Sequence, residues 1–175
     1  QLLKFVITGI FLNAPLFAGP NAQVSVTVSG DANGSVSVGT LFGVTVVITN
    51  VGDEAFLAGD SISYNVNVLG QGVQVFTGGG NITNGLGIGT PVVQNLSFTM
   101  PYSQAPKHAA GWSALATVTA TRDSNGTNNT ASADFSINVP DLQIQDFPGP
   151  AAAPPGSDIG VTGIVTNVGP AATEG

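Results

Sequence analysis

Alternation of apolar and polar positions is the main pattern along this chain, and it predicts β-strands. Between residues 130 and 139, apolar Ala131, Ala133, Phe135, Ile137 and Val139 alternate with polar residues. This two-residue period is that of a half-buried strand. The same pattern marks the segments 24–28, 44–48, 62–68, 75–76, 96–100 and 112–120. No window has the 3.6-residue period of an amphipathic helix, so we expect an all-β fold.

Short segments rich in Gly and Asn separate the predicted strands. Residues 78–81 are interpreted as a loop, and residues 123–126 as the hairpin turn between the strands at 112–120 and 130–139. About seven short antiparallel strands in one segment are typical of an immunoglobulin-like β-sandwich. We predict this sandwich over residues 22–139, with further strands at the two ends of the chain.

An internal repeat divides the chain further. Residues 39–52 (GTLFGVTVVITNVG) recur as residues 156–169 (GSDIGVTGIVTNVG), at a constant offset of 117 residues. A strand precedes each copy, at 24–28 and at 142–144, and the second one is displaced by one residue from that offset. The second copy, residues 140–175, is too short to bury a core of its own. We therefore interpret it as an incomplete second immunoglobulin-like repeat.

Two stretches of the sequence carry a family resemblance. Residues 39–52 and the segment Asn128-Asn129-Thr130-Ala131-Ser132-Ala133 resemble the cell-adhesion-related (CARDB-like) domain of bacterial and archaeal surface proteins. The resemblance covers about residues 22–139 and starts again at Pro140. It implies an immunoglobulin-like repeat, extracellular and non-catalytic, that occurs in tandem. The family usually carries acidic residues in its last hairpin, where this chain has Asp123 and mostly Asn.

The N-terminal segment, residues 1–21, is apolar on both faces when drawn as a strand. It resembles a secretory signal peptide and is too short for a membrane span. We interpret it as a retained strand that needs burial on both sides, and its candidate intersubunit residues are Phe5, Val6, Ile7, Ile10, Phe11 and Leu12. An orphan strand at one end and an incomplete sandwich at the other suit donor-strand complementation between subunits. A truncated tandem array and packing within one chain remain alternatives.

Composition narrows the function classes. The chain is 42% hydrophobic but only 7% charged, with a formal net charge of −7. Three Lys and Arg residues cannot neutralise a phosphate backbone, which excludes nucleic-acid binding. With one His and no Cys, most metal-dependent and acid–base enzymes are excluded as well. We expect no catalytic residue, cofactor, metal site or membrane span.

The individual candidates for chemistry are interpreted as structural residues. His108 lacks a partner for catalysis and is assigned to a loop. The carboxylates Asp53, Glu54 and Asp60 and the segment 123–128 could hold a hard cation, but they fit solvated turns better. Trp112 could stack on a sugar, but its alternating position predicts the core. Residues 78–80 form no phosphate loop because no Lys and no helix follow.

The polar surface depends on hydroxyl and amide groups rather than on charge. With 17 Thr and 14 Asn, it suits an exposed protein, and four sequons make Asn81, Asn95, Asn125 and Asn128 glycosylation candidates. We predict an extracellular or cell-surface structural protein that assembles head to tail with its own copies into a filament and contacts surface or matrix components. The alternative is a spacer or carbohydrate-binding module of a longer tandem-repeat adhesin or secreted enzyme.

Overall fold

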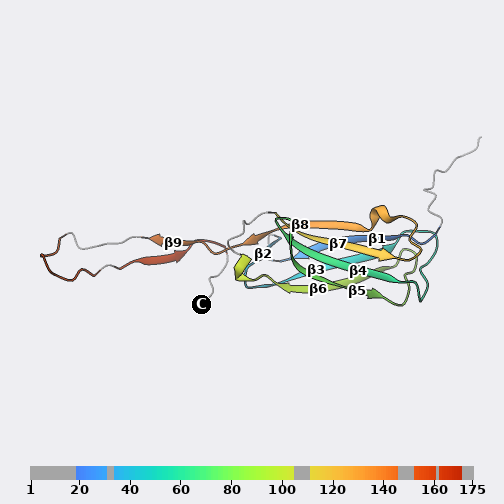
Figure 1. The fold of residues 1–175 in the computed structure, drawn as a ribbon, viewed down its shortest axis with the longest axis horizontal. Coiled ribbons are helices and arrows are strands. Elements are labelled where there is room, and N and C mark those ends of the chain that lie inside the picture. The colour runs from blue at the N-terminus through green and yellow to red at the C-terminus, as the bar shows by residue number, and fades with distance from the viewer. Residues whose placement is uncertain (1–18, 31–33, 105–110, 146–151, 161, 171–175) are drawn as a thin grey trace, which may run out of the picture.

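The computed structural model describes residues 19–30, 34–104, 111–145, 152–160 and 162–170 (Figure 1). These residues hold no α-helix, only the 3₁₀ turns η1 (Tyr102–Gln104) and η2 (Gly126–Asn128). The all-β class predicted from the sequence is confirmed. The strands are β1 (Ala22–Ser29), β2 (Ser35–Ser37), β3 (Leu41–Asn50), β4 (Ile62–Gly70), β5 (Val73–Ile82), β6 (Pro91–Thr99), β7 (Trp112–Ala120), β8 (Thr130–Asn138), β9 (Leu142–Gln145) and β10 (Ile164–Asn167).

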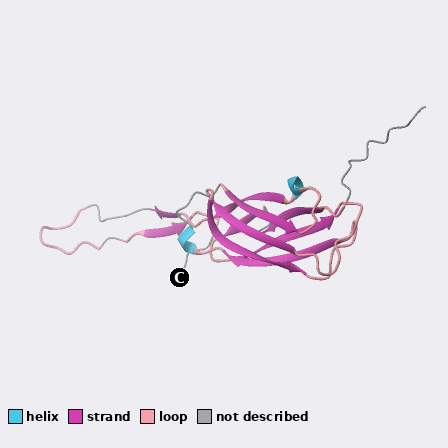
Figure 2. Cartoon of the chain, turned by 45° about the vertical axis from the view of Figure 1, so that its right-hand side comes forward, coloured by secondary structure: helices cyan, strands magenta, loops and turns pink. Residues whose placement is uncertain are grey.

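Strands β1 to β8 form two sheets. The smaller sheet has the order β1-β3-β6, and the larger has the order β2-β8-β7-β4-β5. All pairings are antiparallel except that between β2 and β8. The two sheets make up the curled body of the molecule in Figure 2. Strand β1 of the small sheet packs across β7 and β8 of the large one, so the sheets enclose a common core.

The core is formed by the inward positions of the alternating strands. Phe42 lies at one end of it, and its ring contacts those of Phe76, Phe98 and Phe135. Trp112 is only 1% exposed, which confirms its prediction as a core residue. Most of the fully buried side chains are β-branched, as a pleated, close-packed surface favours; they include Val36, Val38, Val44, Val46, Ile48, Ile62, Val66, Val68, Val118 and Ile137.

The predicted loop at residues 78–81 is wrong, because β5 runs through these residues. Gly78 and Gly80 belong to the strand because neighbouring side chains take the space that their own would need. A Cβ atom on Gly78 would lie 2.5 Å from Cδ2 of Leu96, and one on Gly80 would lie 3.0 Å from the hydroxyl oxygen of Tyr64. The pattern also did not predict β2, which is only three residues long.

The predicted turn between β7 and β8 is confirmed as their connection, although the connection is longer than the segment 123–126. Asp123 accepts a hydrogen bond from the backbone N–H of Asn125 (3.1 Å). Asn125 in turn caps η2 by accepting from the N–H of Thr127 (3.1 Å). These short polar side chains replace the strand hydrogen bonds where the chain reverses.

Strands β9 and β10 form a separate hairpin that extends away from the end of β8 (Figure 1). Leu142 lies opposite Asn167 in this hairpin, as Ala22 lies opposite Asn50 in the β1–β3 pair. The first strand of the repeat therefore recurs at an offset of 120 residues, from Ala22 to Leu142. This is three residues more than the offset of 117 that relates Asn50 to Asn167, so the predicted displacement by one residue is wrong. The predicted and observed displacements, one and three residues, differ by two residues. Because side chains alternate with a period of two, the side chains predicted for each face of the strand are unaffected.

Candidate functional site

Asn50, the last residue of β3, organises one end of the body, and we call its contacts the Asn50 clamp. Its side chain is fully buried. The Oδ1 atom accepts hydrogen bonds from the backbone N–H groups of Asn21 (3.1 Å) and Gly52 (3.0 Å). The Nδ2 group donates to the carbonyl oxygens of Glu54 (2.7 Å) and Leu86 (3.2 Å). These four bonds use the full capacity of a carboxamide and tie the start of β1 to two loops.

Two neighbours of Asn50 complete the clamp. The N–H of Val51 donates to the carbonyl oxygen of Asn21 at 2.8 Å. Gly52 lies close to the backbone of residues 19–21, the segment that leads into β1. A Cβ atom on Gly52 would meet the carbonyl oxygen of Gly19 and come within 2.7 Å of the backbone nitrogen of Asn21. A residue with a side chain would therefore push the incoming chain away.

The β9–β10 hairpin carries the same arrangement around Asn167, which we call the Asn167 clamp. Oδ1 of Asn167 accepts from the N–H groups of Asp141 (2.9 Å) and Gly169 (3.0 Å). The N–H of Val168 donates to the carbonyl oxygen of Asp141 at 2.7 Å. A Cβ atom on Gly169 would lie 2.8 Å from the carbonyl carbon of Pro140. Each contact matches one in the Asn50 clamp, so the internal repeat is also a repeat of local structure.

The sequence comparison missed half of this clamp. Residues 20–23 (PNAQ) recur as residues 140–143 (PDLQ), at an offset of 120 residues. The longer motif that ends in Asn-Val-Gly recurs at an offset of 117, so a comparison at a single offset detects only one strand of each pair. The signal that could have revealed the other strand is the short Pro-Asx-x-Gln pattern, which recurs at the second offset of 120 residues.

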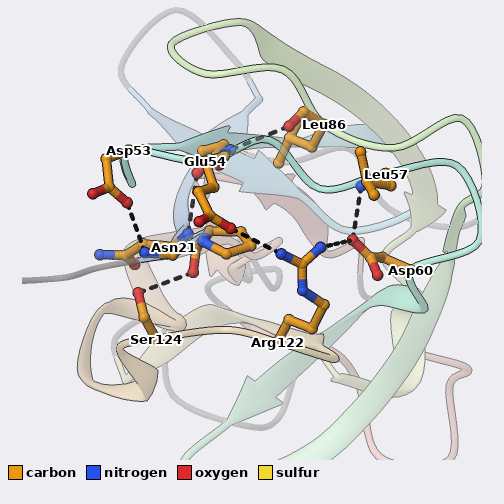
Figure 3. A network of polar contacts seen from close by, with 11 residues as sticks. Asn21, Asp53, Glu54, Leu57, Asp60, Leu86, Arg122 and Ser124 are labelled. Atoms are coloured by element: carbon orange, nitrogen blue, oxygen red, sulfur yellow. Dashed lines mark hydrogen bonds and ion pairs between the residues drawn. The ribbon is translucent and has the colours of Figure 1, made fainter.

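The carboxylates near the Asn50 clamp accept hydrogen bonds from the backbone of its loops and form ion pairs there (Figure 3). Asp53 accepts from the N–H of Gly19 at 2.6 Å. Arg122 bridges Glu54 (2.9 Å) and Asp60 (3.2 Å), and Asp60 also accepts from the N–H of Leu57 (2.7 Å). Within the described ranges, no three His, Cys, Asp or Glu residues are grouped as ligands for a metal ion.

The β7–β8 connection closes over the same end. Ser124 donates to the carbonyl oxygen of Pro20 from both its backbone N–H and its hydroxyl, each at 2.9 Å. The side chains of Asn128 and Asn21 are hydrogen-bonded at 3.0 Å. The entry of the chain into β1 is therefore held from both sheets.

The hairpin around the Asn167 clamp lacks such a cover in the described structure. There, β9 and β10 pair only with each other. Six apolar side chains are more than half exposed on the hairpin and its loop: Leu142, Ile144, Ile159, Ile164, Val165 and Val168. The hairpin thus has the pairing of β1 and β3 without the opposing sheet.

Several predicted sites have definite positions in the fold. Asn81 is exposed near the end of β5, and Asn95 is exposed on β6, where its Oδ1 accepts from the hydroxyl of Thr45 (2.9 Å). Asn125 and Asn128 are half-buried in the β7–β8 connection. Glycosylation at the four positions stays a prediction. His108 and the intersubunit candidates Phe5, Val6, Ile7, Ile10, Phe11 and Leu12 lie outside the described residues.

The chain resembles CARDB domains. It is similar to the crystal structure of the CARDB domain of a Pyrococcus furiosus protein in complex with di-metal ions, with a TM-score of 0.48 and 21% identity over 68% of this chain and 89% of that one. For a solution structure of a CARDB domain from the same organism, the TM-score is 0.46 with 23% identity, over 69% of this chain and 96% of that one.

A more distant likeness is to the putative ApaA protein from Bordetella pertussis, with a TM-score of 0.38 and 15% identity over 68% of this chain and 91% of that one. No protein-family model matches the sequence, and no curated protein matches it.

No helix in the described ranges is long and apolar enough to cross a bilayer.

Proposed function

We propose that this chain is a non-catalytic structural protein of the surface or adhesion type, in which β-domains are joined end to end. The observation that carries the proposal is the Asn167 clamp, which repeats the contacts of the Asn50 clamp at the start of a second β1–β3-like pair. Only residues 139–141 separate β8 from β9. The hairpin is therefore the first part of a second domain that follows almost directly on the first.

We infer an immunoglobulin-type sandwich for the first domain. The sheet orders β1-β3-β6 and β2-β8-β7-β4-β5 support it, because most connections cross from one sheet to the other and only the pairs β4–β5 and β7–β8 stay within the larger sheet. The short β2 follows β1 of the smaller sheet and pairs in parallel with β8, the last strand of the body. The chain therefore crosses to the larger sheet directly after its first strand.

A second domain needs further β-structure to cover its apolar side chains. Two sources are consistent with the exposed hairpin: additional strands of a tandem array, and strands donated by another copy in a filament. The apolar residues on both hairpin strands favour either source. The N-terminal segment remains our proposed donor in the filament, whereas a spacer module requires only continued sequence.

The absence of catalysis and the location outside the cell are parts of the proposal that rest on composition. One His, two Glu and no Cys leave little for acid–base or metal chemistry. A surface solvated by Thr and Asn rather than by charge suits an exposed protein, and the sequons fit the same setting.

Sedimentation of the 175-residue chain over a range of concentrations tests the proposal. Complementation between copies predicts oligomers that grow with concentration and that Ile144→Lys abolishes, because Ile144 faces Val165 across the hairpin. Ser157→Lys, in the exposed loop of the hairpin, is the matched control. A tandem array predicts monomers at all concentrations and strings of domains in images of native material. Monomers together with isolated single domains in native material would contradict the proposal.

A further inference from the structure

The outer face of the larger sheet carries a shallow depression of about 580 Å³. It lies across β5, β4 and β7, on the side that faces away from the core. Its polar lining consists of Ser63, Asn65, Thr77, Asn81, Thr117 and Thr119. A volume of this size falls in the range of small-ligand sites, about 300–1,000 Å³.

The lining offers hydrogen bonds without charge. Hydroxyl groups both donate and accept, and carboxamides present a carbonyl oxygen and an NH₂ group. No residue that lines the depression is charged. Asn65 donates to the hydroxyl of Thr77 (3.3 Å), and its Oδ1 atom accepts no hydrogen bond from the described residues. The hydroxyl groups of a neutral sugar match such a surface, whereas an ionic ligand would find no counter-charge there.

The register of the strands arranges these groups in rows across the sheet. Asn81, Ser63 and Thr119 lie opposite one another, and Gly79, Asn65 and Thr117 form the next row. Neighbouring strands are ~4.8 Å apart, so the first row presents a polar side chain on each of the three strands at about this spacing, and the second row does so on β4 and β7. Gly79 has no side chain, and a Cβ atom there would meet the carbonyl oxygen of Tyr64. The second row is therefore open at its β5 end, where Gly79 lies between Thr77 and Asn81 along the strand.

We propose that this depression binds a neutral polysaccharide chain of another molecule, laid across β5, β4 and β7. Trp112 takes no part in this site, since it is buried in the core as its alternating position predicts. It replaces aromatic stacking by rows of hydroxyl and carboxamide groups. The proposal does not rest on the joining of domains through the hairpin, which is tested by sedimentation, so either can fail alone.

Affinity electrophoresis of the 175-residue chain in native gels tests the proposal. The gels contain hydroxyethyl cellulose, galactomannan or dextran as neutral polymers, and alginate as an anionic one. We expect retardation by at least one neutral polymer and none by alginate, which the net charge of −7 repels. The double variant Asn65→Ala/Thr117→Val should weaken the binding at least tenfold. Asn81→Ala should weaken the binding several-fold. Because Asn81 is exposed, this variant replaces the double variant in the test if the double variant unfolds.

Ser132→Ala is the matched control, because Ser132 is an exposed hydroxyl on β8 outside the depression. It should bind as the unaltered chain does. Absence of retardation by all three neutral polymers, or equal retardation of the Asn65, Asn81 and Ser132 variants, would overturn the proposal. The proposal replaces the sequence-based prediction of a glycan at Asn81: a glycan detected there by intact mass of the native protein would fill the depression and overturn the proposal.

Discussion

Single residues at the ends of strands hold this fold in place, and Asn50 does so with four hydrogen bonds. Its carboxamide lies in a fully buried position and satisfies backbone groups of the incoming chain and of two loops. A buried group that loses its partner costs more than the bond itself contributes to stability. The effect of a substitution here should therefore exceed that of removing any one contact.

Replacing Asn50 by Ala should lower the free energy of unfolding by about 3 kcal/mol or more, because several buried backbone groups lose their partners. Chemical denaturation followed by fluorescence of Trp112 measures the change. The matched control is Asn167→Ala, which removes the equivalent clamp at an exposed position and should change the stability of the first domain by less than about 0.5 kcal/mol. Equal losses in the two variants would contradict the assigned role of burial.

Gln71 is a second residue with a distinct energetic role. In the two-residue turn between β4 and β5, its φ of 53° and the φ of 79° at Gly72 are both in the left-handed region. Asn followed by Gly is the favoured pair in such a turn. Gln71→Asn should raise the free energy of unfolding by about 0.5 kcal/mol, because a left-handed conformation costs an ordinary residue about 1–2 kcal/mol. Gln71→Ala should bring no gain in the same denaturation measurement.

At the scale of elements, β5 depends on glycine for its packing. The inward positions Gly78 and Gly80 leave room for side chains of Leu96 and Tyr64, which fill the edge between the two sheets. A glycine in a strand interior usually weakens the strand, but here it permits a close approach. The element is therefore stabilised by its neighbours rather than by its own side chains.

Gly78→Ala should lower the thermal midpoint, because its Cβ atom would lie 2.5 Å from Cδ2 of Leu96. Because Cδ2 is the end of a flexible, half-buried side chain, the cost should lie at or below the lower end of the about 1–3 kcal/mol that overpacking of a closed core costs. Thr77→Ala, on the outer face of the same strand, is the control and should stay within about 0.5 kcal/mol of the unaltered chain. Differential scanning calorimetry compares the two, and a larger loss for the Thr77 variant would refute this view of β5.

At the scale of the whole molecule, the described part of the chain consists of a packed body and a hairpin with few contacts to it. Among the described elements, β9 has substantial contacts only with β10. The body buries its own core, whereas the hairpin leaves apolar side chains in water. Stability and association should therefore depend on different parts of the chain.

Truncation after Val139 should leave the unfolding free energy of the body unchanged within about 0.5 kcal/mol, since it removes no core residue. Amide exchange of the 175-residue chain should show strong protection in β3 and β7 and little in β9 and β10, unless the hairpin is covered by another copy. A marked destabilisation by the truncation would show instead that residues 140–175 pack on the body.

The all-β class, most strand positions, the core position of Trp112 and the repetition of Asn-Val-Gly followed from the sequence. A two-residue alternation is a local property, and it determines which face of a strand is apolar wherever the chain is extended. The glycine run of β5 and the short β2 were not predicted, because each depends on side chains or strands that are distant in sequence. The Pro-Asx-x-Gln half of the clamp was missed for lack of a second offset.

By itself the sequence determined which residues alternate, where most turns lie and that only 7% of the residues are charged. The tertiary structure alone decided that Asn50 and Asn167 close equivalent clamps, that Arg122 bridges two carboxylates, and that hydroxyl groups of three strands line one depression. The physical reason is that hydrogen bonds and pairing register join residues tens of positions apart, whereas periodicity reports only on neighbours along the chain.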